Sequence, residues 1–248
     1  MFPIRDINPT RIFPIATLAL IVANVLVFAL WQPSPDSPEG TEFLYERAAI
    51  ACELTTSEPL SEKEIVDGRC VDNDGGSQLF PDKNVWLSGF LSLFLHGGII
   101  HLAGNMWFLW IFGNNVEEAF GTLGYLTLYL AAGVAATASF VLLHANSTDP
   151  LVGASGAIAG VLGAYLVLFP RHRIMSLVFV FFVSVPAMFF LGFWFLAQLA
   201  IVEVGVAWEA HVGGFLLGVL VTLPLRDSLL RRVRQLHSPR IPVRHTPF

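Results

Sequence analysis

Apolar residues occur along this chain in long blocks that contain few charges, separated by shorter polar segments. Each block is about 17 to 24 residues long, which is the length a helix needs to cross a hydrocarbon core about 30 Å thick. Backbone polar groups in lipid must be hydrogen-bonded within their own segment, and no stretch of about ten residues alternates between apolar and polar positions. The pattern therefore predicts an all-α polytopic membrane protein.

The blocks predict six transmembrane helices. They cover residues 14–31, 99–112, 122–143, 151–169, 186–204 and 206–225. The apolar run from 174 to 204 is too long for one span of about 20 residues. Because proline is well tolerated in the first turn of a helix, we place the start of the fifth helix at Pro186. Residues 174–185 are then expected to form an interfacial or re-entrant segment, and residues 113–121 a short turn after the second helix.

The composition agrees with this prediction, since 54% of the residues are hydrophobic and 13% are charged, against about 25% charged in an average soluble domain. A water-soluble globular protein is excluded. Residues 32–88 hold twelve Asp or Glu and four Lys or Arg, whereas the other ten Lys or Arg lie near the N-terminus, at 171–173 and after 225. Basic residues accumulate on the cytoplasmic side of a membrane, so both termini are predicted to be cytoplasmic and the acidic segment extracytoplasmic. This division of charge gives no support to nucleic acid binding.

The predicted organisation has three parts. Residues 1–13 form a cytoplasmic N-terminus, residues 14–225 a six-span membrane domain that includes the acidic extracytoplasmic loop 32–88, and residues 226–248 a basic cytoplasmic tail. The first span is interpreted as an uncleaved signal anchor, because no cleavage site of the A-x-A type follows it. We expect a multi-pass protein of the bacterial cytoplasmic (inner) membrane, with a tail that contacts anionic lipid.

Both cysteines of the chain, Cys52 and Cys70, lie in the acidic loop, eighteen positions apart. An extracytoplasmic compartment permits disulfides. A bond between these two residues would close a loop and stabilise the protein by about 3 kcal/mol, so its role would be structural. Two unpaired thiols are the alternative.

A few polar or ionisable side chains lie in the predicted spans or at their ends, where burial without a partner costs several kcal/mol, so each is a candidate functional residue. They are His96, His101, Asn105, Ser155, Glu203, Glu209 and His211. The second, fourth and sixth spans all run inward from the extracytoplasmic side. We therefore expect the residues near the starts of these spans to share one layer about 5 to 10 Å below the outer surface. Those residues are His101, Asn105, Ser155 and His211.

Small residues at helical spacing flank two of these side chains. Gly156 and Gly160 follow Ser155, and Gly214 and Gly218 follow His211. Such small-x-x-x-small pairs let two helix backbones approach closely, which would bring Ser155 and His211 within hydrogen-bonding reach. Taken singly, the serine is also explained by helix packing, and the histidine by a structural role or a proton path.

A serine and a histidine in contact are chemically sufficient for acyl transfer, because the imidazole removes the hydroxyl proton and later returns it to the leaving group. No Asp occurs within a predicted span, so the pair would act as a dyad. The oxyanion needs hydrogen-bond donors, which His101 and Asn105 can supply together with the Ser155 backbone N–H. Gly153 gives the backbone the freedom to make the turn before the serine. This chemistry requires no metal and no cofactor.

The motifs His96-x4-His101-x3-Asn105 in a second span, Gly153-Ala-Ser155-Gly156 at the start of a fourth, and Ala210-His211-Val-Gly-Gly214-x3-Gly218 in a sixth resemble the rhomboid family of intramembrane serine proteases. The resemblance covers about residues 86–225. It implies Ser155 as nucleophile, His211 as base, and His101 and Asn105 as oxyanion donors, with His96 in a supporting role. It also implies transmembrane protein substrates, cut near their outer ends after lateral entry beside the aromatic residues 189–195 of the fifth span.

The chain departs from the family pattern at two positions. Many members carry an aromatic residue one turn after the nucleophile that packs on the catalytic imidazole, whereas this chain has Ala159, so His211 must be held otherwise. Glu209 occupies a position that is often apolar. On a helix it faces away from His211, and we expect it to reach water near the outer end, as we expect for Glu203.

Other classes of membrane protein fit less well. A zinc protease would show H-E-x-x-H, which does not occur, and an aspartyl protease would need Asp in two spans. A transporter or channel would spread polar residues through the membrane depth and show a repeat. The remaining alternative is a non-catalytic rhomboid-like protein that binds or routes transmembrane helices.

Overall fold

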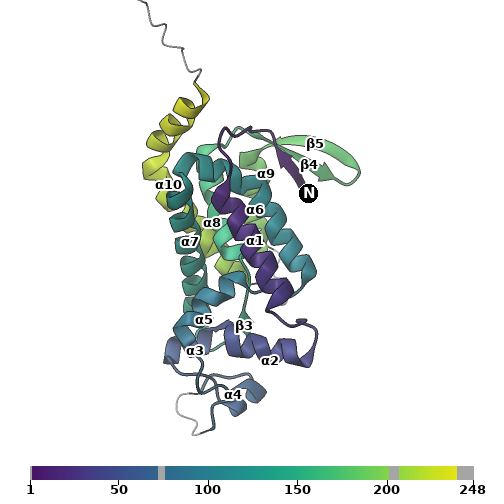
Figure 1. The fold of residues 1–248 in the computed structure, drawn as a ribbon, viewed down its shortest axis with the longest axis vertical. Coiled ribbons are helices and arrows are strands. Elements are labelled where there is room, and N and C mark those ends of the chain that lie inside the picture. Colours follow the sequence, from purple (N-terminus) through teal and green to yellow (C-terminus); the bar gives the residue numbers. More distant parts are fainter. Residues whose placement is uncertain (1, 72–75, 201–206, 239–248) are drawn as a thin grey trace, which may run out of the picture.

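The computed structural model of this chain describes residues 2–71, 76–200 and 207–238 (Figure 1). Most of these residues are helical. The longer helices are α1 (Ile15–Leu30), α6 (Ile99–Phe120), α7 (Thr122–Leu143), α8 (Ser155–Leu168), α9 (Ala187–Ala200) and α10 (Trp208–His237). Each of them begins in one of the six apolar blocks identified above, and α6 and α10 extend beyond the ends of theirs. Helices α7 and α10 are each long and apolar enough to cross a membrane. The pair formed by residues 85–94 and α6 passes the same test together with a bend of 74°, while α1, α8 and α9 are apolar but shorter.

The acidic segment and the residues that follow it, up to Phe94, fold into short elements at one end of the molecule. They are α2 (Pro38–Arg47), β2 (Ala49–Ile50), α3 (Ala51–Thr56), α4 (Glu62–Asp67), α5 (Val85–Leu91) and the 3-10 turn η1 (Ser92–Phe94). Figure 1 shows α2 to α5 at the lower end of the bundle, opposite the N-terminal strand and the basic end of α10. The acidic segment and the basic terminal regions therefore lie at opposite ends.

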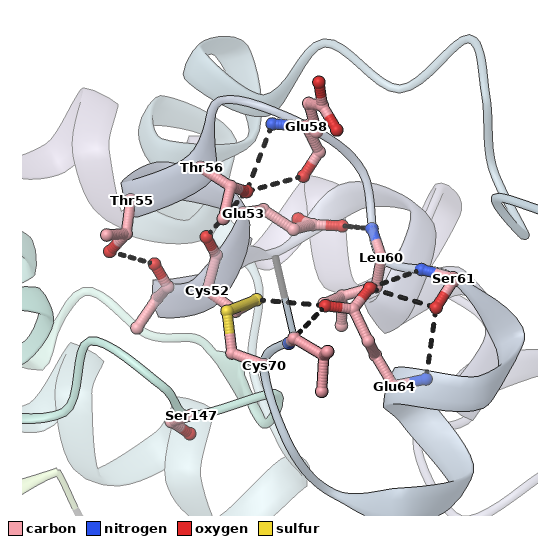
Figure 2. Close-up of a disulfide and its surroundings, with 12 residues drawn as sticks. Cys52, Glu53, Thr55, Thr56, Glu58, Leu60, Ser61, Glu64, Cys70 and Ser147 are labelled. Atoms are coloured by element: carbon pink, nitrogen blue, oxygen red, sulfur yellow. Dashed lines mark hydrogen bonds between the residues drawn. A yellow bond between two sulfur atoms is a disulfide. The ribbon is translucent and has the colours of Figure 1, made fainter. Parts of the chain in front are cut away.

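A disulfide joins Cys52 in α3 to Cys70, with their Cα atoms 5.6 Å apart (Figure 2). Beside it, the Glu64 side chain accepts hydrogen bonds from the backbone amides of Ser61 and Val71. An ion pair between Glu53 and Lys83, whose side chains are both buried, also connects parts of this segment. Burial raises the pKa of Glu53 and lowers the pKa of Lys83, against the attraction between the two groups.

The acidic segment is hydrogen-bonded to the chain that precedes α8. Strand β2 pairs antiparallel with β3 (Pro150–Leu151), and the amide of Cys52 donates to the carbonyl oxygen of Ser147 at 3.0 Å. The amide of Ala49 donates to the Ser92 hydroxyl. The acidic segment thus contacts the residues that lead into α8.

Three regions differ from the sequence prediction. Residues 113–120, predicted as a turn, continue α6 to Phe120. The charged pair that suggested a turn is buried there: Glu117 accepts from the amides of Ala16 and Thr17 at 2.9 Å each, and so satisfies the free N–H groups at the start of α1. Helix α10 likewise continues past residue 225, where we predicted the tail to begin, as far as His237.

The all-helical prediction is wrong for residues 173–186. They form a hairpin of β4 (Arg173–Val178) and β5 (Phe181–Pro186), and β1 (Phe2–Asp6) pairs antiparallel with β4. The segment is rich in Val, Ile and Phe, which favour a pleated conformation. Its apolar character alone did not distinguish a strand from an interfacial helix.

Helices α7, α8 and α10 pack around one another at the centre of the bundle, and α8 is buried along most of its length. A Cβ on Gly214 would lie 2.0 Å from the carbonyl oxygen of Gly156, and one on Gly218 would lie 2.0 Å from that of Gly160. The backbones of α8 and α10 are therefore in direct contact, which only glycine permits at these positions.

Candidate active site

The contact between α8 and α10 brings a serine and a histidine together at the ends of the two helices. Ser155 is the first residue of α8, and His211 lies in the first turn of α10. The distance between Ser155 Oγ and His211 Nε2 is 2.8 Å. A hydrogen bond of this length lets the imidazole act on the hydroxyl proton.

The turn before Ser155 depends on Gly153. Its φ is +119°, which side-chain-bearing residues rarely adopt, and a Cβ there would lie 2.8 Å from the His101 ring. The amide of Gly153 donates to the carbonyl oxygen of Ser92 at 2.9 Å. Because Ser155 begins the helix, its own backbone N–H has no intrahelical partner and is available to a bound group.

His101 and Asn105 lie one turn apart on α6 and face the same space. Together with Ser155 and His211 they line a cavity of about 230 Å³. Asn105 is 8% exposed, and among the described residues its Nδ2 atom is a buried donor without a hydrogen-bond partner. Unpaired buried donors are rare in folded proteins, and this one lies at the wall of the cavity that contains Ser155. The arrangement can stabilise negative charge on an oxygen bound beside the serine.

The other face of His211 contacts α9. The Nδ1 atom of His211 is 2.7 Å from Gln198 Oε1, and the Trp194 ring lies with its centroid 6.1 Å from that of the imidazole. Ala159 lies fully buried in α8. The imidazole is thus held from α9, in a chain whose α8 offers no aromatic ring at position 159.

His96 does not line the cavity, but it contacts His101, which does. Its side chain is fully buried and packs edge-on against the His101 ring, with the centroids 5.2 Å apart. Its backbone amide donates to Gln32 Oε1 at 3.0 Å, which ties the chain after α1 to the start of α6. His96 touches neither Ser155 nor His211 by any described hydrogen bond.

The expectation that Glu209 reaches water is wrong. Its side chain is 6% exposed, and Glu209 Oε1 lies 2.6 Å from Nε2 of His144, the residue that follows α7. The partner comes from a different helix, so the position of Glu209 on its own helix could not reveal it. Glu203, the second such carboxylate, lies outside the described residues.

Sequence reasoning missed Gln198 and Trp194. The sequence feature that could have identified them was a polar amide inside a predicted apolar span, four residues after an aromatic residue.

Within the described ranges, one cluster of side chains could hold a metal ion. It consists of Cys52, Glu64 and Cys70, and its two sulfur atoms are bonded to each other. The cluster lies in the acidic segment and does not line the cavity.

The comparisons with known proteins agree on one family. The Rhomboid domain model matches residues 83–228. The chain is 31% identical to Rhomboid protein 1, mitochondrial, of Saccharomyces cerevisiae over 82% of its length, and 30% identical to the human Presenilin-associated rhomboid-like protein, mitochondrial, over 81%. It is 44% identical to Rhomboid protease GluP of Bacillus subtilis over 37% of its length. The chain spans 51%, 45% and 18% of these three relatives.

Proposed function

Because this chain belongs to the rhomboid family, a family of polytopic membrane proteins, we propose that it is an intramembrane serine endopeptidase that cleaves transmembrane protein substrates. Ser155 is the nucleophile and His211 the general base. The observation that carries the proposal is the 2.8 Å contact between Ser155 Oγ and His211 Nε2 at the wall of a cavity with an unpaired amide donor. The chain spans about half the length of two of these relatives, so the activity is proposed for this chain on its own residues.

The reaction follows from the positions of these groups. Ser155 Oγ attacks the carbonyl carbon of the scissile peptide bond while His211 Nε2 takes the hydroxyl proton. The oxyanion accepts hydrogen bonds from the Ser155 N–H, from Asn105 Nδ2 and from His101. The imidazolium then returns the proton to the leaving amine, which departs from an acyl-enzyme. Water hydrolyses the acyl-enzyme with His211 again as base.

The topology proposed is six transmembrane helices with both termini cytoplasmic. The acidic loop 32–88 is extracytoplasmic, and the protein resides in the bacterial cytoplasmic membrane. Support comes from the position of the acidic segment at the end opposite the basic residues (Figure 1) and from the disulfide in that segment, since disulfides persist in oxidising compartments. In this arrangement the dyad lies near the extracytoplasmic face, and substrates reach it from the lipid.

The test is covalent labelling of the purified protein with a fluorophosphonate probe, which reacts with an activated serine and needs no known substrate. We expect labelling of the wild type and none of Ser155→Ala or His211→Ala. Ser228→Ala and His172→Ala, which change the same residue types away from the dyad, serve as matched controls and should label normally.

Two results would contradict the proposal. One is a folded wild-type protein that does not react with the probe, which would favour a non-catalytic rhomboid-like protein that binds or routes membrane helices. The other is labelling that persists in Ser155→Ala, which would place the reactive group elsewhere.

A further inference from the structure

The Nδ1 atom of His211, the ring nitrogen that faces away from Ser155, has a hydrogen-bond partner. In a Ser–His–Asp triad this partner is an aspartate, but the predicted spans of this chain contain none. Gln198 Oε1 lies 2.7 Å from Nδ1 of His211, on the opposite side of the ring from Ser155. We infer that Gln198 is the positioning residue of the catalytic base, a neutral third member that makes the dyad function as a Ser–His–Gln array. The inference rests on the proposed function and deepens it.

The orientation of the Gln198 amide is determined by its own helix. Gln198 Nε2 donates to the carbonyl oxygen of Trp194, one turn earlier in α9, at 3.2 Å. The amide oxygen is therefore the group that faces His211. Reversing the amide would place its oxygen against another carbonyl oxygen and its NH₂ group against the imidazole.

The amide orientation selects one tautomer of His211. An oxygen acceptor at Nδ1 requires the proton to be on Nδ1, which leaves the lone pair of Nε2 directed at the Ser155 hydroxyl. This is the tautomer that can accept the serine proton. In a triad, the carboxylate performs the same orienting task and also stabilises the imidazolium electrostatically. A glutamine supplies the orientation without the charge.

No other described group competes for this position. The residues that line the cavity include no Asp or Glu within the described ranges. The nearest carboxylate along the chain, Glu209, is already bonded to His144. Trp194 packs on the imidazole from the same helix, so α9 supplies both contacts that restrict rotation of the ring.

The ability of His211 to accept the serine proton therefore depends on the position of α9. The face of this helix away from the dyad is open, with Phe189, Phe193 and Leu196 each about 60% exposed. Ser155 and His211 are held at their separation by the backbones of α8 and α10, whereas the orientation of the ring depends on α9. A displacement of α9 would break the Gln198 contact and leave the imidazole free to rotate or to change tautomer.

The experiment compares Gln198→Met with Gln198→Glu in the full-length protein, using the fluorophosphonate probe. Met keeps the length of the side chain and removes the strong acceptor, whereas Glu keeps an oxygen acceptor in its place. We expect Gln198→Met to lower the maximal labelling rate about 10²-fold with the probe's half-saturating concentration unchanged. Gln198→Glu should restore the rate to within about tenfold of wild type. Leu196→Met introduces the same residue on the exposed face of α9. It is the matched control and should label at the wild-type rate.

The design separates positioning from folding. A merely structural role would reduce the final labelled fraction and leave the rate of the folded fraction unchanged, and that result would overturn the inference. Labelling of Gln198→Met at the wild-type rate would overturn it equally, while leaving the proposed function in place. A wild type that fails to label at Ser155 would overturn the proposed function and the inference with it.

Discussion

The two sides of the dyad are held in different ways. Ser155 begins a helix that is buried along most of its length, and the turn before it is hydrogen-bonded to Ser92. His211 shares the backbone contact between α8 and α10, but its ring takes its orientation from α9, a helix with one open face. Backbone packing therefore sets the distance between Ser155 and His211, whereas the ring orientation of the proposed base depends on contacts with Gln198 and Trp194 of α9.

The largest effect is expected where the backbones touch. In Gly214→Ala the new methyl group would meet the Gly156 carbonyl oxygen at 2.0 Å, so α10 must move away from α8. We expect a loss of stability of about 3 kcal/mol and complete loss of probe labelling, measured by thermal unfolding in detergent and by the fluorophosphonate assay. Gly192→Ala in α9, where nothing lies within 4 Å of the new atom, is the control and should fold and label normally. A Gly214→Ala protein that labels like wild type would refute direct backbone contact.

A smaller effect is expected at the oxyanion donor. Asn105→Ala removes a buried amide that has no described partner, so the stability of the protein should change little. The maximal labelling rate should fall about 10²-fold, because the donor acts only on the developing negative charge. The measurement is the labelling rate alongside the unfolding temperature. A large drop in unfolding temperature with an unchanged rate would make Asn105 a packing residue instead.

The disulfide of the acidic segment can be used to test how the position of Ser155 is maintained. Replacing both Cys52 and Cys70 by serine opens a loop of eighteen positions and should destabilise the protein by about 3 kcal/mol. The labelling rate should fall less than tenfold, because β2 loses support but the α8–α10 contact remains. Reductant should reproduce the effect on the wild type and have none on the double variant. If reductant leaves wild-type stability unchanged, the disulfide does not support this region.

The smallest effect concerns Asp6, at the end remote from the site. Burial raises the pKa of Asp6 to about 6, against hydrogen bonds from Tyr165 and Asn115. Between about pH 4 and 6 the folded protein therefore binds more protons than the unfolded chain, so stability falls as the pH rises through this window. Asp6→Asn should unfold about 3 °C above wild type at pH 7, and this advantage should shrink as the pH falls through the window and be nearly gone at pH 4. An advantage that is equal at both pH values would exclude Asp6 as the titrating group, and labelling should be unaffected throughout.

Helix positions and the convergence of four polar residues could be predicted because they depend on features that repeat along the chain. Apolar blocks locate α1 and α6 to α10, and the position of each polar residue within its block predicts that His101, Asn105, Ser155 and His211 lie together, as they do around one cavity. The charges of Glu117 and Glu118, by contrast, suggested a turn, because the pattern does not show that Glu117 would cap a helix a hundred residues earlier.

The contacts that orient side chains could not be predicted from spacing. Gln198 and His144 each meet a partner from a different helix, and the rotation of one helix against another sets those contacts. The β4–β5 hairpin was missed for a related reason: its pairing with β1 joins residues more than 160 positions apart, which a local apolar run cannot indicate.

The pairing of β2 with β3 has a consequence for biogenesis. It joins residues 49 and 50 to residues 151 and 150, so the strand that leads into the nucleophile turn is completed by a segment synthesised about a hundred residues earlier. In the proposed topology both partners must first be translocated. A nascent chain with only its first three helices inserted therefore cannot yet form this pairing, and the proposed proteolytic site is completed late in maturation, on the extracytoplasmic side in that topology.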